Sequence, residues 1–300
     1  MGVETFIKDA WRKNAPDVVG WWNGALPAFV TARHAREPLA GVPVFCYHLV
    51  EADRLEADLE FLRRNGYRTL AAGELVAYLA GSLSIPPRSV VLTFDDGPRN
   101  FYDVAFPLLK KYAAKVVAFI APGLHSEAGP EDAAAARPMT WGEIRAVQDS
   151  GLVDFESHTL ESRYVPDWPR PAPLAGCAPS IENARRRPAL ALNDDLAASR
   201  TAIASRLPAV MVEHLSFPMY QGNEAAVRIA ATLGFKACHW GLIAGRPLNR
   251  RGDSPFHISR LSDEFLRRLP GEGRATILDL VRERLHRAKT ARAWRRQFAS

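Results

Sequence analysis

The chain contains the stretch VVLTFDDG at residues 90–97, which joins a strand-like segment to a pair of acidic side chains. Residues 90–94 are apolar or β-branched without polar alternation, as expected for a parallel strand buried on both faces. Asp95 and Asp96 follow at once, and two carboxylates beside a buried strand are costly unless a cation compensates them. A divalent metal is the usual compensation, with one carboxylate as its ligand and the other as a base. A solvated Asp-Asp-Gly turn is the alternative interpretation.

Further apolar, strand-like runs alternate with helical patterns along the chain. Apolar residues that recur at spacings of three and four predict the helices, and Asn193 is expected to cap one over 194–207. Seven strands alternating with helices predict an α/β fold with a parallel (β/α) barrel rather than an open sheet. Besides 90–94, the predicted strands are 42–48, 116–121, 152–157, 214–217, 236–240 and 257–261.

The domain organisation follows from where this rhythm begins and ends. Residues 1–41 contain no strand pattern and are predicted to form an N-terminal arm, and residues 42–274 form the barrel. Within it, residues 163–192 contain six prolines and no period, which is typical of a functional lid or a disordered insertion. Residues 275–300 repeat apolar side chains every three or four positions and predict a basic amphipathic helix.

Composition and charge exclude several classes of protein. The 300 residues are 47% hydrophobic and 24% charged, which excludes collagen, coiled coil and wholesale disorder. The net charge is +6, and residues 282–296 contain seven Arg or Lys and one acid. The rest of the chain is therefore balanced, which argues against a nucleic-acid groove. The basic helix could contact an anionic membrane surface, or it could pack on the barrel with a solvated Arg face.

Cellular location is predicted from the start of the chain and from its cysteines. The first residues lack the continuous apolar segment of a secretory signal, and no apolar run reaches the length of a membrane span. Three cysteines are too few and too scattered for a disulfide framework. We therefore expect a cytoplasmic protein, peripheral to the inner membrane face if the C-terminal helix binds lipid.

Polar side chains follow several of the predicted strands. His48 ends the first run, Asp95 and Asp96 the second, His158 the fourth, and the segment Pro218–Tyr220 the fifth. In parallel barrels the catalytic residues gather at the carboxyl ends of the strands. The sequence therefore predicts that these side chains face one pocket, although each histidine taken alone is more often structural.

Four segments in the same order resemble the polysaccharide deacetylase family, also known as the NodB homology domain or carbohydrate esterase family 4. TFDDG at 93–97 resembles its most specific motif, and VFCYH at 44–48 resembles the first strand of its poly-N-acetylglucosamine deacetylase branch. SHT at 157–159 matches the start of its H-[ST]-x-x-H motif, and SFPMYQG at 216–222 resembles its F-x-Y-P-Y-G segment. The resemblance covers roughly residues 42–261.

The resemblance implies a distorted (β/α) barrel that binds one divalent ion. Zinc is expected, with cobalt, nickel or manganese as alternatives. By carry-over, Asp95 is the general base, and Asp96 and His158 are metal ligands. The backbone N–H of Tyr220 would help to hold the oxyanion, and His48 would protonate the departing amine. His257 is a weaker candidate for this general acid.

One ligand position departs from the family pattern. The second histidine is expected four residues after His158, where this chain has Ser162. Three protein ligands are usual at a catalytic zinc site, so Glu161 is the predicted third ligand, and the alternatives are that another side chain reaches the metal or that the metal binds weakly. Trp168, Pro218 and Tyr220 are predicted to contact the substrate. A Trp168 that only pins the insertion to the barrel is the alternative.

The predicted function is hydrolysis of a carbon–nitrogen amide bond that is not a peptide bond. N-deacetylation of an N-acetylated sugar or polysaccharide is the leading hypothesis. Amide hydrolysis on a non-carbohydrate substrate is a second. The third is a degenerate glycan-binding protein, which Ser162 favours and the intact Asp95–Asp96 pair disfavours. No nucleic-acid partner is expected.

Overall fold

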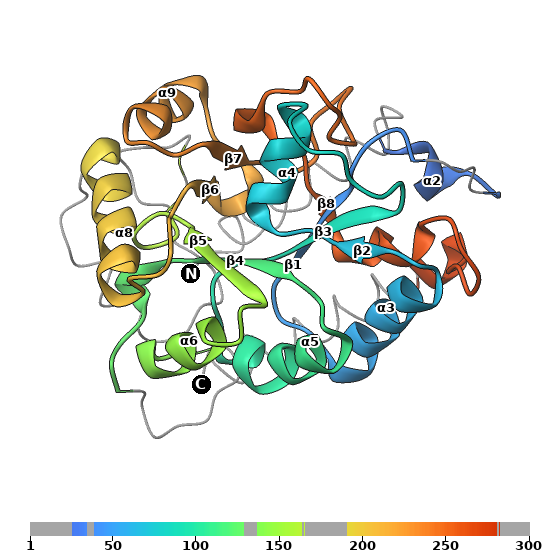
Figure 1. The fold of residues 1–300 in the computed structure, drawn as a ribbon, viewed down its shortest axis with the longest axis horizontal. Helices are drawn as coiled ribbons and strands as arrows, with labels where there is room; N and C mark the ends of the chain where they lie inside the picture. The colour runs from blue at the N-terminus through green and yellow to red at the C-terminus, as the bar shows by residue number, and fades with distance from the viewer. Residues whose placement is uncertain are drawn as a thin grey trace, which may run out of the picture.

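The computed structural model describes residues 26–34, 39–128, 137–163, 165, 191–280 and 282. A parallel sheet forms the centre of the fold. Seven strands follow the order β7-β6-β5-β4-β3-β1-β8, and the short strand β2 (Arg68–Thr69) pairs with β3. A parallel bridge between His239 and Ile258 brings the β7 side of the sheet to the segment before β8. The sheet is therefore a distorted barrel, as predicted (Figure 1). Its strands are β1 (Val44–Tyr47), β3 (Ser89–Phe94), β4 (Val116–Ile120), β5 (Val153–Ser157), β6 (His214–Ser216), β7 (Ala237–His239) and β8 (Leu261–Ser262).

Most helices lie around the outside of the sheet (Figure 1), whereas the helix at residues 72–79 contributes Leu75 to the interior cluster. Turns of 3-10 helix follow several strands. The helices are α2 (Ala28–Thr31), α3 (Ala52–Arg64), α4 (Ala72–Leu79), α5 (Phe106–Tyr112), α6 (Trp141–Gln148), α8 (Leu192–Arg206) and α9 (Glu224–Thr232). A π-helical turn, η1 (Phe101–Ala105), leads into α5. The 3-10 turns are η2 (Pro122–Leu124), η4 (Pro218–Tyr220), η5 (Pro255–His257) and η6 (Asp263–Arg268).

Two apolar clusters divide the core and decide which side chains face the barrel interior. Phe45 and Leu92 belong to the larger cluster between the sheet and the outer helices. Val44 and Val91, one position earlier on each strand, belong to a second cluster with Leu75 of α4. Because side chains alternate between the two faces of a strand, the residues in step with Val44 and Val91 point into the barrel.

Two local predictions were wrong. Residues 257–261 are not one strand, because Ser254 and Pro255 open the turn η5, with the Ser254 hydroxyl accepting a hydrogen bond from Phe256 N–H (3.3 Å). Asn193 does not cap α8, because the helix already begins at Leu192. The two-residue strand β2 was missed, since so short a segment shows no period.

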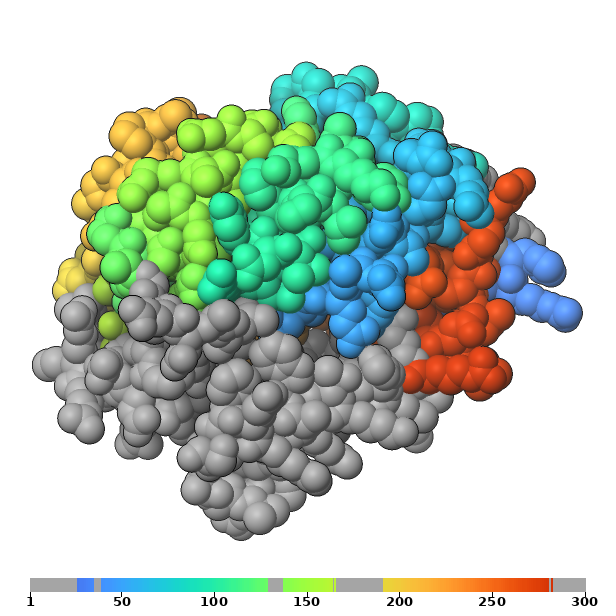
Figure 2. Space-filling view, turned by 90° about the horizontal axis from the view of Figure 1, so that it is seen from below, coloured from blue at the N-terminus to red at the C-terminus, as the bar shows by residue number. Residues whose placement is uncertain are grey.

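The predicted N-terminal arm (residues 1–41) contains the short helix α2. Within the predicted arm, α2 packs on the barrel: Phe29 and Val30 are buried, and the Arg268 guanidinium donates to the Val30 and Ala32 carbonyls (both 2.8 Å). Figure 2 shows this segment beside the one that follows β8. Most of the predicted insertion and C-terminal helix lies outside the described residues. Among the described helices, none is both long and apolar enough to cross a membrane.

Candidate active site

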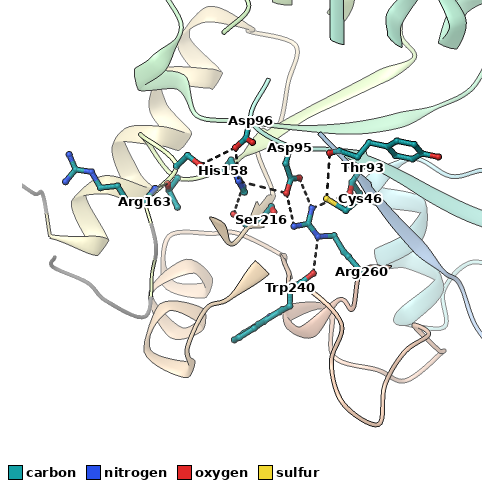
Figure 3. A network of polar contacts seen from close by, with 12 residues as sticks. Cys46, Thr93, Asp95, Asp96, His158, Arg163, Ser216, Trp240 and Arg260 are labelled. Atoms are coloured by element: carbon teal, nitrogen blue, oxygen red, sulfur yellow. Dashed lines mark hydrogen bonds and ion pairs between the residues drawn. The ribbon is translucent and has the colours of Figure 1, made fainter. Parts of the chain in front are cut away.

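The carboxyl end of β3 points an acidic side chain into the barrel. Thr93 and Asp95 lie in step with Val91 and therefore face the interior, where Asp95 is only 1% exposed. Arg260 approaches from the segment just before β8 and donates to both carboxylate oxygens of Asp95, at 2.7 and 2.9 Å (Figure 3). The Arg260 Nε also donates to the Trp240 carbonyl (3.0 Å), which fixes the guanidinium plane. Asp95 is thus held in one orientation by a bidentate ion pair.

Arg260 determines the charge state of Asp95. Burial by itself would raise the pKa of this carboxyl, but the charge and hydrogen bonds of Arg260 hold the pKa well below its usual range. Asp95 is therefore ionised at any physiological pH. The cation that compensates Asp95 is an arginine, which the sequence analysis did not identify. The signal for Arg260 was present as a charged residue inside an apolar run.

His158 and Asp96 form the part of the site that fits a metal ion. The His158 Nδ1 donates to the Ser216 carbonyl (3.0 Å), which fixes the tautomer with the Nε2 lone pair free. That Nε2 lies 3.6 Å from Asp96 Oδ1 and 4.0 Å from Asp95 Oδ2. A backbone carbonyl behind a ligating histidine is the usual support for a metal ligand. The donor set therefore fits a divalent ion between Asp96 and His158.

Glu161 does not join this pair. Its carboxylate accepts from the guanidinium of Arg163, both side chains are buried, and Figure 3 shows Arg163 directed away from Asp96. Glu161, Asp96 and His158 do not bring their ligand atoms within 4.8 Å of one another in the part of the chain that the structure describes. The prediction that Glu161 is the third ligand is wrong, because a nearby arginine already neutralises it.

Ser162 takes the position in which a histidine was expected. Its hydroxyl donates to Asp96 Oδ1 at 3.3 Å, and the residue is 4% exposed. The oxygen that faces the proposed metal position is therefore a neutral hydroxyl, which is a weaker ligand for zinc than an imidazole.

Within the described residues, one group of three potential ligands comes together, and it lies on the other side of Asp95. Cys46, His48 and Asp95 place ligand atoms within 4.8 Å of one another. Arg260 already occupies both Asp95 oxygens, and burial raises the pKa of the Cys46 thiol far above its usual range. A second cation here would meet a guanidinium and a protonated thiol. We therefore interpret this group as placing His48 beside the base.

Tyr220 contributes its ring rather than its backbone. Its N–H donates to the Phe217 carbonyl (3.0 Å) within η4, so the predicted oxyanion donor is already engaged and that prediction is wrong. The ring meets His48 edge-on (5.8 Å between centroids) and lies 5.4 Å from the guanidinium carbon of Arg260. Gly241 allows this approach, because a Cβ there would lie 2.6 Å from that of Tyr220.

The remaining predicted site residues have different outcomes. Pro218 is buried at the start of η4, which does not support its predicted contact with substrate. Trp168 lies outside the described residues. His257 stacks on Trp240 (5.4 Å between centroids) and pairs with Glu224 at the surface (2.9 Å), so its proposal as a general acid was wrong.

Unusual backbone conformations gather at the same edge of the sheet. Among the described non-glycine residues, six have a positive φ, and Ala113 at the end of α5 is the one that lies elsewhere. Such conformations persist where the surrounding structure imposes them, and they cluster at functional sites. The five in the strand-end loops are Asp96, Thr159, Ser162, Met219 and Tyr220.

Comparisons with known proteins agree with this geometry. The family model described as polysaccharide deacetylase matches residues 84–238, just over half of the chain. The chain belongs to the polysaccharide deacetylase family, as its motifs predicted.

Two curated relatives have more specific names. The poly-β-1,6-N-acetyl-D-glucosamine N-deacetylase of Escherichia coli (strain K12) is 31% identical over 122 residues, which is 38% of this chain and 18% of that protein. The protein of the same name from Staphylococcus aureus (strain N315) is 29% identical over 110 residues, 37% of each chain. The chain therefore spans well under two thirds of the length of these relatives.

Solved structures show the same fold. The structure of IcaB from Ammonifex degensii superposes with a TM-score of 0.60 at 24% identity, covering 87% of this chain and 99% of that one. A de-N-acetylase from Aggregatibacter actinomycetemcomitans superposes with a TM-score of 0.57 at 23% identity, covering 73% and 94% of the two chains.

Proposed function

We propose that this protein is a metal-dependent N-deacetylase that removes acetyl groups from an N-acetylated sugar polymer. The observation that carries the proposal is the convergence of an ionised, arginine-held Asp95 with an Asp96–His158 pair whose ring nitrogen is free for a metal. Membership of the polysaccharide deacetylase family supports it. The names of the curated relatives make β-1,6-linked N-acetylglucosamine the first substrate to test.

Asp96 and His158 would bind the metal ion. When bound, the ion supplies Lewis acidity towards the acetamide carbonyl and its attacking water. One imidazole and one carboxylate are compatible with zinc, and cobalt, nickel and manganese are the alternatives to compare with it.

The protein's own groups would move the protons. Asp95 would accept a proton from the attacking water, and Arg260 holds its carboxylate in place for that transfer. His48, which lies beside Asp95, would donate a proton to the amide nitrogen as the carbon–nitrogen bond breaks. Acetate and a free amine are then the products. Each positioned proton transfer of this kind contributes about 10²- to 10⁴-fold to the rate.

A glycan-binding protein without turnover is the second candidate, and the β5 end of the site favours it. Ser162 and the Glu161–Arg163 pair leave Asp96 and His158 as the strong metal ligands at this position. The Asp95–Arg260 pair supports an enzyme, because binding alone does not require an oriented base.

The test is acetate release from β-1,6-linked N-acetylglucosamine oligomers, with zinc, cobalt, nickel or manganese added to the metal-free protein. We expect metal-dependent release that Asp95→Asn lowers by about 10³-fold. Binding of the oligomers without release under all four metals would favour the glycan-binding protein. Release from a simple non-sugar acetamide, but not from the oligomers, would favour the non-carbohydrate amidohydrolase.

We also propose that the protein acts in the cytoplasm and contacts an anionic membrane through residues 282–296. The seven Arg or Lys residues of this segment support the proposal, because basic clusters bind anionic lipids and salt weakens that attraction. Sedimentation of the protein with anionic vesicles should fall when the seven Arg and Lys residues of this segment are replaced by Gln, and also when the salt concentration is raised. Equal sedimentation of both forms would contradict it.

A further inference from the structure

A single side-chain amide joins the loop after β1 to the loop after β3. The Asn100 Oδ1 accepts from the Val50 N–H (2.8 Å), and its Nδ2 donates to the Val50 carbonyl (3.1 Å). Asn100 is 7% exposed, so water competes little for these bonds. The amide therefore pairs with both backbone groups of one residue, as a neighbouring strand would.

The position of this clamp relates it to the candidate active site. The segments that leave β1 and β3 are joined by the Asp95 N–H, which donates to the Tyr47 carbonyl (3.0 Å). The Asn100 amide joins them again at Val50, three residues after Tyr47. His48 lies between these two attachments on the segment after β1. On the segment after β3, Asp95 and Asp96 precede Asn100.

Packing fixes part of this loop: Val50 packs against the larger core cluster, and the His48 ring meets Tyr220 edge-on. Leu49, the residue between His48 and Val50, is 47% exposed despite its apolar side chain. The leucine at the centre of the loop therefore adds little to its orientation. The two bonds to Asn100 add a directional attachment of the backbone at Val50, two residues after His48.

We propose that Asn100 is a positioning residue that holds His48 within proton-transfer reach of the substrate nitrogen. The proposal rests on the proposed function, in which the His48 imidazolium donates its proton as the carbon–nitrogen bond breaks. Asn100 does not touch the reacting atoms and acts through the backbone of Val50. Displacing a catalytic group by about 1 Å can cost about 100-fold in rate, so losing the clamp affects the step that needs His48.

The experiment compares two leaving groups in the zinc-loaded protein. An N-acetylglucosamine oligomer releases an amine that must be protonated, whereas 4-nitrophenyl acetate releases a phenolate that leaves without a proton. In Asn100→Ala we expect kcat/KM for the oligomer to fall about 100-fold and that for the ester to change less than about threefold. Asn100→Asp keeps the shape and the acceptor but loses the donor to the Val50 carbonyl, and it should show the same split.

Asn65 provides a matched control. Its amide makes the same pair of bonds with one residue, to the Glu272 carbonyl (3.1 Å) and from the Glu272 N–H (2.7 Å), and it is also 7% exposed. It lies at the end of α3, beside the start of β3 and away from Asp95. The Asn65 amide also donates to the Phe61 carbonyl (2.9 Å), so Asn65→Ala should lose at least as much stability as Asn100→Ala, without separating the two substrates. An equal loss on both substrates in Asn100→Ala, or the same split in Asn65→Ala, overturns the proposal.

Hydrogen exchange at the Val50 amide separates failure of the clamp from failure of the proposed function. Exchange should accelerate in Asn100→Ala but not in Asn65→Ala, whether or not the protein turns over. Unchanged exchange overturns the clamp itself. Faster exchange in a protein whose wild type releases no acetate supports the clamp and places the failure in the proposed function.

Discussion

Two turns at the same edge of the sheet contribute to the site in different ways. The β3 turn (residues 95–97) presents Asp95, whose charge and orientation are set by Arg260. The β5 turn (residues 158–163) presents His158 in a good ligand orientation, but it adds a serine and a neutralised glutamate. The base is therefore fully supported by its surroundings, whereas the proposed metal position has two strong ligands.

The two buried ion pairs in these turns explain the contrast. Arg260 comes from the far end of the chain and aims its guanidinium at Asp95 inside the barrel. Arg163 is two residues from Glu161 and holds that carboxylate away from Asp96 and His158. The same kind of pair fixes an acid in the site in one turn and removes an acid from it in the other.

The largest effect is expected when the base Asp95 is replaced and the proposed metal ligands, Asp96 and His158, are left unchanged. Asp95→Asn should lower kcat for acetate release by about 10³-fold and leave zinc content nearly unchanged. Asp96→Asn should lose both. Metal analysis and acetate assays on the same samples check this, and wild-type rates in Asp95→Asn would show that Asp95 is not the base.

Arg260→Gln tests whether the β3 turn depends on its arginine. Breaking a buried pair commonly costs about 3–5 kcal/mol, because the other charge stays buried alone. The pKa of Asp95 is depressed in the folded state, so its pairing stabilises the fold above the pKa of the unfolded chain, about 4. This contribution is lost as pH falls through the folded-state value.

Denaturant unfolding of both forms across pH measures this effect. The difference in unfolding free energy between wild type and Arg260→Gln should be largest near pH 7 and shrink below about pH 4. A difference that stays constant between pH 7 and pH 3 would contradict the assigned role of the ion pair.

Ser162→His sharpens the other side of the comparison by restoring an imidazole near Asp96. We expect zinc affinity to rise about tenfold or more, a size of change common for alterations around metal sites. Competition titration with a chromophoric chelator measures it. Unchanged affinity would mean that Ser162 does not border the metal position.

Glu161→Gln is expected to have the smallest effect on metal binding. Because Arg163 already neutralises this carboxylate, zinc affinity should change by less than about twofold, although stability falls as a buried pair is broken. A large loss of zinc would show that Glu161 leaves Arg163 to bind the ion.

The sequence predicted the fold and the acidic centre because both depend on local patterns. Apolar runs identified six of the seven main strands, and TFDDG placed Asp95 and Asp96 at a strand end. The partners of these residues could not be predicted in the same way. Arg260 is 165 positions from Asp95, and the Glu161–Arg163 pair depends on backbone conformation within a turn. Which way a side chain points is decided by neighbours that a linear motif does not contain.

The most direct test of this account is acetate release measured against free zinc concentration, starting from metal-free protein and a β-1,6-linked N-acetylglucosamine oligomer. The account predicts no release without metal, a rise that saturates with zinc, and saturation at lower zinc in Ser162→His. Release that persists in the metal-free protein, or that is absent at every zinc concentration, would contradict it.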